Sequence, residues 1–237
     1  MTEAMRLPEI EVRDPEGLRA KEVAQESLAD AVRELLDATI RTKAAPETLD
    51  ALTEQIRAVS RELLQEAHPG PLGLRVCSDG KLRDPGNPAV GRRNAIAPPI
   101  RVKSDRENAR VSASFNLGAP YEGPPAHVHG GMLALVLDQV LGTVPALVGR
   151  PGMTAYLNVT YRRPTPLQED LTAEGWVDRE EGWKTFVKGH ILDAQGRVTA
   201  EAEGLFIVPK FAREALSHPM SDAGEYEAPQ TGWFPPA

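Results

Sequence analysis

The residues best suited to chemistry lie close together in the middle of the chain. His129 precedes two glycines, and the uniformly apolar run over 132–137 predicts a helix that is buried on all sides. The amino end of a helix presents unpaired N–H groups, and glycines let a ligand approach them closely. The N–H of Gly130 is therefore a candidate donor to a polarised carbonyl or a developing oxyanion. A simple tight turn into the helix is the alternative interpretation.

A single carboxylate, Asp138, interrupts this apolar run. Apolar surroundings solvate a carboxylate poorly, which makes Asp138 a candidate general base or nucleophile, with an inert structural acid as the alternative. If the helix begins at Gly130, Asp138 lies roughly 12 Å from His129 along its axis. The two side chains cannot share one proton within a chain. We therefore expect the site to draw them from different protomers, or to use them on different substrate atoms.

A strand with a hydroxyl near its start is predicted after the helix. The Gly-Pro break over 149–152 is followed by alternating apolar residues over 153–162. The hydroxyl of Thr154 could orient a water molecule or donate a hydrogen bond to a carboxylate. Threonine is also a common strand former, so a structural role remains open.

Four basic residues suggest a local cationic cluster in an otherwise acidic chain: Arg162, Arg163, Arg179 and Lys184. Such a cluster suits phosphate or pyrophosphate, although a solvated strand end would look the same in sequence. His127, His129 and Asp138 could also be read as a metal site. Their spacing suggests no further ligand, so we expect neither a metal nor a cofactor.

Composition narrows the class of protein. The formal net charge of −7 argues against a dedicated nucleic-acid binder. The single cysteine, Cys77, excludes an intrachain disulfide framework and fits a reducing compartment. No signal-peptide pattern opens the chain, and its apolar runs fall well short of the ~18 residues of a membrane span. We expect a soluble, cytoplasmic protein.

The periodicity predicts three parts. Residues 1–68 form a helical extension, with amphipathic helices over about 16–38 and from 46 to 64 that pair as a hairpin. Packing or oligomerisation is the expected role of this hairpin, and partner binding or a lid is the alternative. Residues 69–210 form the main domain, which begins with a Pro- and Gly-rich loop over 69–100. Residues 211–237 form a polar tail that Trp233 and Phe234 could dock.

Strand patterns recur through the main domain, and short connections join those that follow the helix. The predicted strands span 110–117, 153–162, 170–178, 183–193 and 197–208. Such connections indicate an antiparallel meander. The fold class is therefore α+β, with an antiparallel sheet of five to six strands wrapped around a long central helix.

The text EGPPAHVHGGMLALVLD, followed by MTAYLNVTYRRPTPL, resembles the hotdog-fold acyl-CoA thioesterases of the phenylacetyl-CoA thioesterase (PaaI) type. That group includes the thioesterase-superfamily-member proteins of animals. The resemblance covers about residues 110–210. It implies a hotdog fold, hydrolysis of acyl-CoA thioesters to a carboxylic acid and CoA, and a role in fatty acid metabolism.

The resemblance also implies residue roles. Asp138 would act as general base or nucleophile, and Thr154 would help to hold the water. The N–H of Gly130 would polarise the thioester carbonyl, with support from His129. Three further positions match those that contact the CoA moiety in relatives: Thr160, Arg162 and Lys184. Some relatives carry an asparagine six residues before the motif histidine, where this chain has Gly123.

Relatives of this type work as homodimers or homotetramers with the site between protomers, which agrees with the separation of His129 and Asp138. A non-catalytic module that binds acyl-CoA or an acyl-carrier protein is the main alternative, because a fold does not fix a function. A hydratase or dehydratase is a third possibility. The sequence does not predict the acyl chain length.

Overall fold

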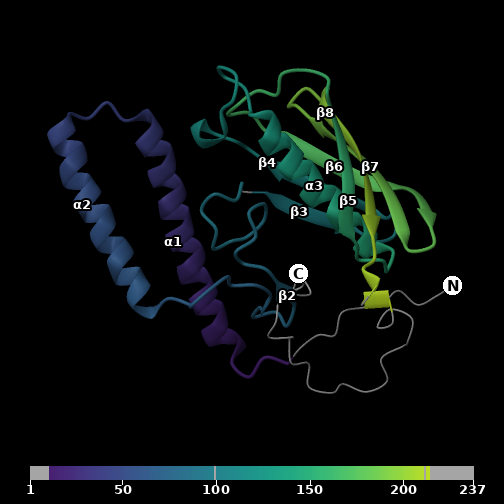
Figure 1. The fold of residues 1–237 in the computed structure, drawn as a ribbon, viewed down its shortest axis with the longest axis horizontal. Helices are drawn as coiled ribbons and strands as arrows, with labels where there is room; N and C mark the ends of the chain where they lie inside the picture. The colour runs from purple at the N-terminus through teal and green to yellow at the C-terminus, as the bar shows by residue number, and fades with distance from the viewer. Residues whose placement is uncertain (1–10, 99, 211, 214–237) are drawn as a thin grey trace.

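The computed structural model describes residues 11–98, 100–210 and 212–213. Its main unit is one helix, α3 (Gly130–Leu147), inside a six-stranded antiparallel sheet of order β3-β4-β6-β7-β8-β5 (Figure 1). The strands are β3 (Arg101–Asp105), β4 (Arg110–Phe115), β5 (Met153–Tyr161), β6 (Leu171–Glu181), β7 (Lys184–Leu192) and β8 (Val198–Ile207). This architecture confirms the predicted α+β class and the wrap of sheet around helix.

The five strands predicted from alternation are all present, with ends shifted by up to three residues. The structure adds β3, which the sequence reasoning did not predict. Every side chain of β3 is exposed, so the strand shows no alternation between apolar and polar residues. It forms one edge of the sheet by pairing with β4, and β5 forms the other edge.

Two glycines in the sheet let it approach α3 closely. A Cβ on Gly189 would lie 2.6 Å from Cδ1 of Leu141, and one on Gly175 would lie 3.2 Å from Cγ2 of Val144. The buried face of the helix fills this space with apolar side chains: Leu133, Val136, Leu137, Val140, Leu141 and Val144. Close approach and burial together make this the dense core of the molecule.

One face of α3 remains open in the single chain. Gly131 is exposed, and Leu135, Asp138 and Gln139 are only half-buried. The prediction of a helix buried on all sides is therefore wrong for one chain, because the sheet covers only part of the circumference. Among the described residues, α3 is the one helix whose length and composition would allow it to cross a membrane, but its buried side chains lie in the core of the sheet.

The N-terminal extension contains the two predicted helices, α1 (Pro15–Arg41) and α2 (Pro46–Leu63), followed by the short η1 (Leu64–Glu66). Asp14 caps α1 by accepting a hydrogen bond from the N–H of Gly17 at 2.9 Å. Figure 1 shows the helices running in opposite directions, with α2 on the side away from the sheet. No residue of α2 is buried.

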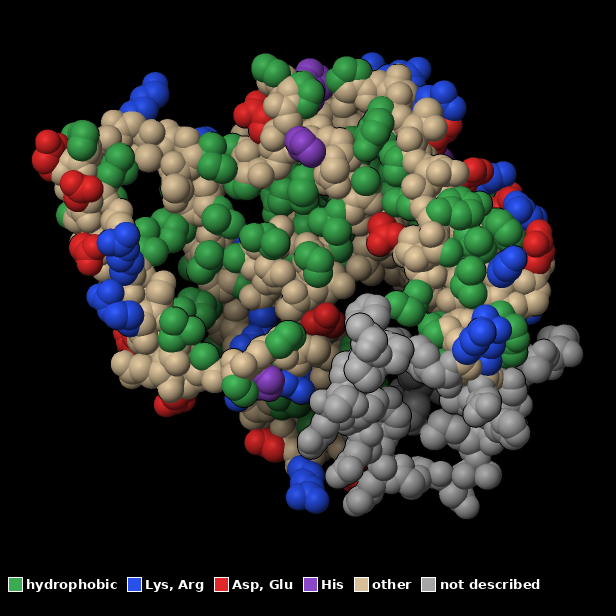
Figure 2. All heavy atoms as spheres, in the orientation of Figure 1, with side chains coloured by type: hydrophobic (Ala, Val, Ile, Leu, Met, Phe, Trp, Pro, Cys, Tyr) green, Lys and Arg blue, Asp and Glu red, His purple; other side chains and the backbone are tan. Residues whose placement is uncertain are grey.

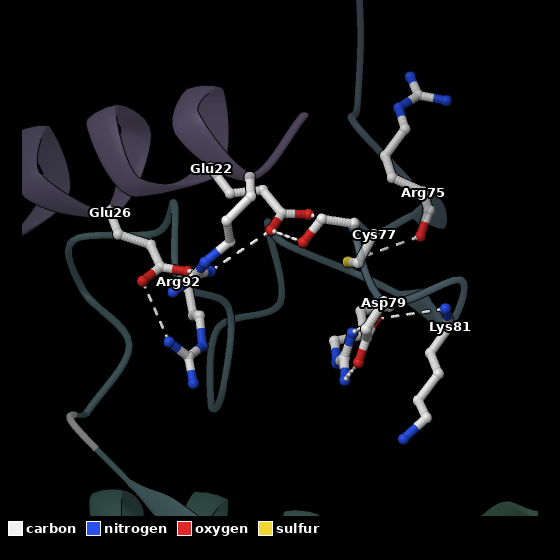
Figure 3. A network of polar contacts seen from close by, with 10 residues as sticks. Glu22, Glu26, Arg75, Cys77, Asp79, Lys81 and Arg92 are labelled. Carbon is white, nitrogen blue, oxygen red and sulfur yellow. Dashed lines mark hydrogen bonds and ion pairs between the residues drawn. The ribbon is translucent and has the colours of Figure 1, made fainter. Parts of the chain in front are cut away.

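Polar contacts fix α1 to the loop region that contains β1 (Arg75–Val76) and β2 (Leu82–Arg83) (Figure 3). The carboxylate of Glu22 accepts hydrogen bonds from the N–H and hydroxyl of Ser78, at 2.8 and 2.7 Å. Glu26 pairs with Arg92 at 3.0 Å. The division into parts at residues 68 and 210 stays a prediction, and the proposed docking of Trp233 and Phe234 lies outside the described residues.

Candidate active site

The amino end of α3 carries the first half of the site. His129 caps the helix, because its Nδ1 accepts a hydrogen bond from the N–H of Gly131 at 3.0 Å. The backbone N–H of His129 donates to the carbonyl of Tyr121 at 2.9 Å, which fixes the loop that precedes the helix. In the described part of the chain, the N–H of Gly130 donates to no group, so it remains available to a ligand.

Glycine is required at position 123 by the path of this loop. A Cβ on Gly123 would lie 2.7 Å from the Cα of His129. The asparagine that some relatives carry at the matching position would therefore displace the backbone of the capping histidine. The departure noted in the sequence is thus part of how this chain holds His129.

Tyr161 is a site residue that the sequence reasoning missed. It ends β5, and its hydroxyl donates to the carbonyl of Gly130 at 2.9 Å. A Cβ on Gly130 would lie 3.2 Å from that hydroxyl, so glycine allows the tyrosine to lie against the start of the helix. The available signal was the tyrosine at the strand end, but no sequence pattern shows which helix it will contact.

The second half of the site joins the middle of α3 to the start of β5. The hydroxyl of Thr154 donates to Oδ1 of Asp138 at 2.9 Å. The structure thus confirms that the Thr154 hydroxyl binds a carboxylate. Oδ2 of Asp138 accepts no hydrogen bond from the described residues, and the side chain lies on the half-buried face of the helix. A carboxylate with one oriented and one free oxygen can accept a proton from water.

The two halves do not meet within one chain. Asp138 follows Gly130 by eight positions, which corresponds to roughly 12 Å along α3. Tyr161 and Thr154 lie at opposite ends of β5 and contact these two points of the helix in turn. A single reacting group cannot contact both the Gly130 N–H and Asp138 of the same copy.

The predicted cationic cluster does not form within one chain. Arg162 follows β5, where its Nε donates to Glu201 at 2.9 Å, and this hydrogen bond lowers the pKa of Glu201. Lys184 begins β7 opposite Ile207, which also pairs with Met153 at the far end of β5. The antiparallel register therefore places Lys184 at the other end of the sheet from Arg162. That part of the prediction is wrong for one chain.

Thr160 lies on the outer face of the sheet. Its neighbours Leu157 and Val159 pack toward the core, and alternation turns Thr160 away from it. It lines a shallow hollow of about 420 Å³ with several other polar and aromatic side chains: Asn158, Trp176, Lys188, His190, Glu201 and Glu203. Among the described residues, no group of three or more His, Cys, Asp or Glu side chains could hold a metal ion.

Comparison with known proteins identifies the family and agrees with the fold. The family model described as thioesterase superfamily matches residues 126–200. A crystal structure of a thioesterase superfamily protein is 36% identical and superposes with a TM-score of 0.70, covering 77% of this chain and 90% of that protein. The chain therefore belongs to the thioesterase superfamily, and its helix within an antiparallel sheet is a hotdog fold.

Part of the chain is also similar to curated proteins that are named acyl-coenzyme A thioesterases. The chain is 35% identical to acyl-coenzyme A thioesterase THEM4 of Mus musculus over 99 residues, which is 41% of this chain and 43% of that protein. The THEM4 protein of Bos taurus is 36% identical over 107 residues, or 45% and 44% of the two chains. The match thus spans less than half the length of these relatives.

Proposed function

We propose that this protein hydrolyses acyl-CoA thioesters to a carboxylic acid and CoA. The observation that carries the proposal is the 2.9 Å hydrogen bond from Thr154 to Asp138 on the open face of α3. It orients a carboxylate on the same helix whose amino end offers a free N–H of the kind that binds oxyanions, and a second copy would bring the two together. The names of the THEM4 relatives support the same substrate class.

The chemistry follows from these groups. The free oxygen of Asp138 takes a proton from a water molecule as the water oxygen bonds to the thioester carbonyl carbon. The negative charge that develops on the carbonyl oxygen accepts a hydrogen bond from the Gly130 N–H. Collapse of this intermediate breaks the C–S bond, and the proton held by Asp138 passes to the departing thiolate. Direct attack by Asp138, through a mixed anhydride, is the alternative route.

A homodimer would join the two half-sites. Among the described strands, β5 lies at an edge of the sheet and pairs only with β8, and it exposes large apolar side chains at Met153, Tyr156 and Tyr161. Antiparallel pairing of β5 with a second copy about a two-fold axis is the symmetric way to cover such an edge. A tetramer would be two such dimers.

The residue numbers favour this axis. Gly130 and Asp138 lie at equal distances from Ala134 along α3, while Thr154 and Tyr161 lie on opposite sides of the midpoint of β5, three and four positions from Leu157. One two-fold axis near these midpoints would place Asp138 and Thr154 of each copy beside Gly130 and Tyr161 of the other. The site would then be complete twice per dimer.

The same pairing would bring Arg162 and Lys184, which lie far apart in one chain, close to each other across the dimer. Antiparallel β5 strands would bring Arg162 of one copy to the sheet end where Lys184 of the second copy begins β7. Arg162 and Lys184, with Thr160 nearby, are therefore proposed as contacts for the phosphates of CoA. A reducing, cytoplasmic location is proposed on the single cysteine, Cys77, and a role in fatty acid metabolism on the relatives' substrate class.

The test is Asp138→Asn, assayed for CoA release with a thiol reagent over acyl-CoAs of increasing chain length. Asparagine keeps the size of the side chain but cannot take the proton, so kcat should fall by about 100-fold or more. Undiminished kcat in a folded variant would contradict the proposal. Saturable stabilisation of the wild-type chain by acyl-CoA, without CoA release, would instead indicate a binding module.

A further inference from the structure

The outer helix of the hairpin carries an apolar stripe that no described part of the chain buries. Five residues of α2 recur at alternating spacings of three and four: Leu49, Leu52, Ile56, Val59 and Leu63. Their side chains are between 39 and 53% exposed. This spacing is the seam of a helix that packs on another helix, and it is narrower than the apolar face of a helix on a globular core.

Hydrogen bonds and ion pairs fix α1, which forms the base of the hairpin, to the loop region over 69–100. In the described part of the chain, α2 is attached through α1 and does not pack on the main unit. Glu22 and Glu26 attach α1 to the loop region below it (Figure 3). Arg33 donates to the carbonyls of Ala97 and Asn94, both at 3.3 Å. Most of the stability of a helix in a protein comes from packing of its apolar face, and α2 has no buried residue.

The charge of the hairpin argues against a membrane as the occupant of this stripe. Acidic residues outnumber basic ones over residues 15–63. A helix that lies on an anionic lipid surface carries Lys and Arg on its polar face. The flanks of the stripe are uncharged at Thr48, Gln55 and Ser60, and Glu62 adds an acidic group, which suits a protein surface better than an anionic membrane.

The hairpin lies next to the face that the second copy would cover, with α1 between α2 and the main unit. α1 lies against η2 (Ala119–Tyr121), whose last residue accepts the hydrogen bond from the N–H of His129. Figure 2 shows hydrophobic side chains over α1 and α2 on the same side of the molecule as the hydrophobic centre of the main unit. A copy seated on the open face of α3 and on β5 would therefore lie within reach of the hairpin.

We propose that the hairpin is an arm whose α2 stripe packs on a second copy of this chain, the copy that completes the active site. The proposal rests on the dimer and the activity proposed for that site. Each copy then holds the other by two contacts, the β5 edge and the arm, and the arm borders the neighbour's site.

The test compares two variants of the full-length protein that add the same charge to α2. Ile56→Glu places a carboxylate in the stripe, and Ala58→Glu places one about 200° around the helix from it, on the exposed face away from the stripe. We expect Ile56→Glu to raise the dimer dissociation constant at least tenfold, about 1.4 kcal/mol, measured by sedimentation velocity. Ala58→Glu should leave it within about twofold. Equal constants for Ile56→Glu and the wild type would overturn the arm and leave the thioesterase proposal standing.

Hydrogen exchange identifies the occupant. If a second copy covers the stripe, the amides of α2 should exchange slowly above the dissociation constant and faster on dilution below it. Protection that does not change with dilution would mean that the chain covers its own helix, and would overturn the proposal. Binding of the wild type, but not Ile56→Glu, to phosphatidylcholine–phosphatidylserine vesicles would also overturn it. A monomeric wild type with full CoA release would refute the dimer itself.

Discussion

The sheet around α3 buries its apolar side chains, whereas the hairpin of α1 and α2 leaves most of its apolar side chains exposed. The sheet closes tightly over α3, since a Cβ on Gly189 would lie 2.6 Å from Leu141 and one on Gly175 would lie 3.2 Å from Val144, and the core forms one continuous apolar cluster. The hairpin buries one apolar residue, Ala29, and leaves the α2 stripe open. The first region completes its own packing, whereas the second has an amphipathic pattern that its own chain does not satisfy.

The open face of α3 lies between these extremes. It is part of the dense unit, yet it leaves Asp138 half-buried beside an unpaired strand edge. Where a stable core stops short of full coverage, the uncovered groups include the candidate chemistry. The comparison thus separates residues that maintain the fold from residues that await a ligand or a second copy.

The largest expected effect is on the dense region. In Gly189→Ala, the added Cβ would lie 2.3 Å from the carbonyl oxygen of Glu174 on β6 and 2.6 Å from Cδ1 of Leu141 on α3, so both the neighbouring strand and the helix must shift. We expect a loss of about 3 kcal/mol in the free energy of unfolding, measured by denaturant titration. Gly70→Ala is the control, since nothing lies within 4 Å of its Cβ, and it should change stability by no more than about 0.5 kcal/mol. Equal stability of the two variants would contradict the close packing described at Gly189.

A substitution at the open face of α3 should lower the catalytic rate and leave the stability of the fold nearly unchanged. Thr154→Ala removes the donor that orients Asp138, and we expect kcat to fall about tenfold, by analogy with the loss of one positioning hydrogen bond. Because Thr154 is exposed, the midpoint of denaturant unfolding should hardly move. Thr154→Ser, which keeps the hydroxyl, should recover most of the rate. A Ser variant as slow as the Ala variant would argue that the hydroxyl has no such role.

A smaller rate effect is expected at the amino end of α3. Tyr161→Phe removes the hydroxyl that holds the carbonyl of Gly130. The Gly130 N–H should then be less well oriented toward the oxyanion, with kcat reduced by about three- to tenfold and KM little changed. Steady-state kinetics separates the two parameters. A change confined to KM would instead assign Tyr161 to substrate binding.

The smallest effect on stability is expected in the loop region to which α1 is fixed. The bidentate hydrogen bonds from Arg83 lower the pKa of Asp79 from 3.8 to about 2. A carboxyl with a depressed pKa in the folded state stabilises above its unfolded value, and this contribution is lost as the pH falls from about 4 to 2. Because both side chains are nearly half exposed, Asp79→Asn should cost less than about 1 kcal/mol at pH 7. The stability difference between variant and wild type should vanish near pH 2, and a constant difference would contradict this account.

Local pattern was sufficient for most elements. Helical spacing predicted α1 and α2, and alternation predicted five of the six strands of the main sheet, because each of these carries its own period. β3 was not predicted, because all its side chains are exposed and its sequence does not alternate. The motif residues were found by chemistry: a carboxylate in an apolar run and a histidine before two glycines.

Sequence alone determined that a mostly apolar helix carrying Asp138 would be wrapped by antiparallel strands, and that His129 and Asp138 could not share one proton within one chain. Only the tertiary structure decided that Thr154 contacts Asp138, that Tyr161 contacts Gly130, and that Lys184 and Arg162 lie apart. These outcomes depend on strand order and register, which place β5 at an edge beside β8. Register is set by packing between residues far apart in the chain, and no local period records it.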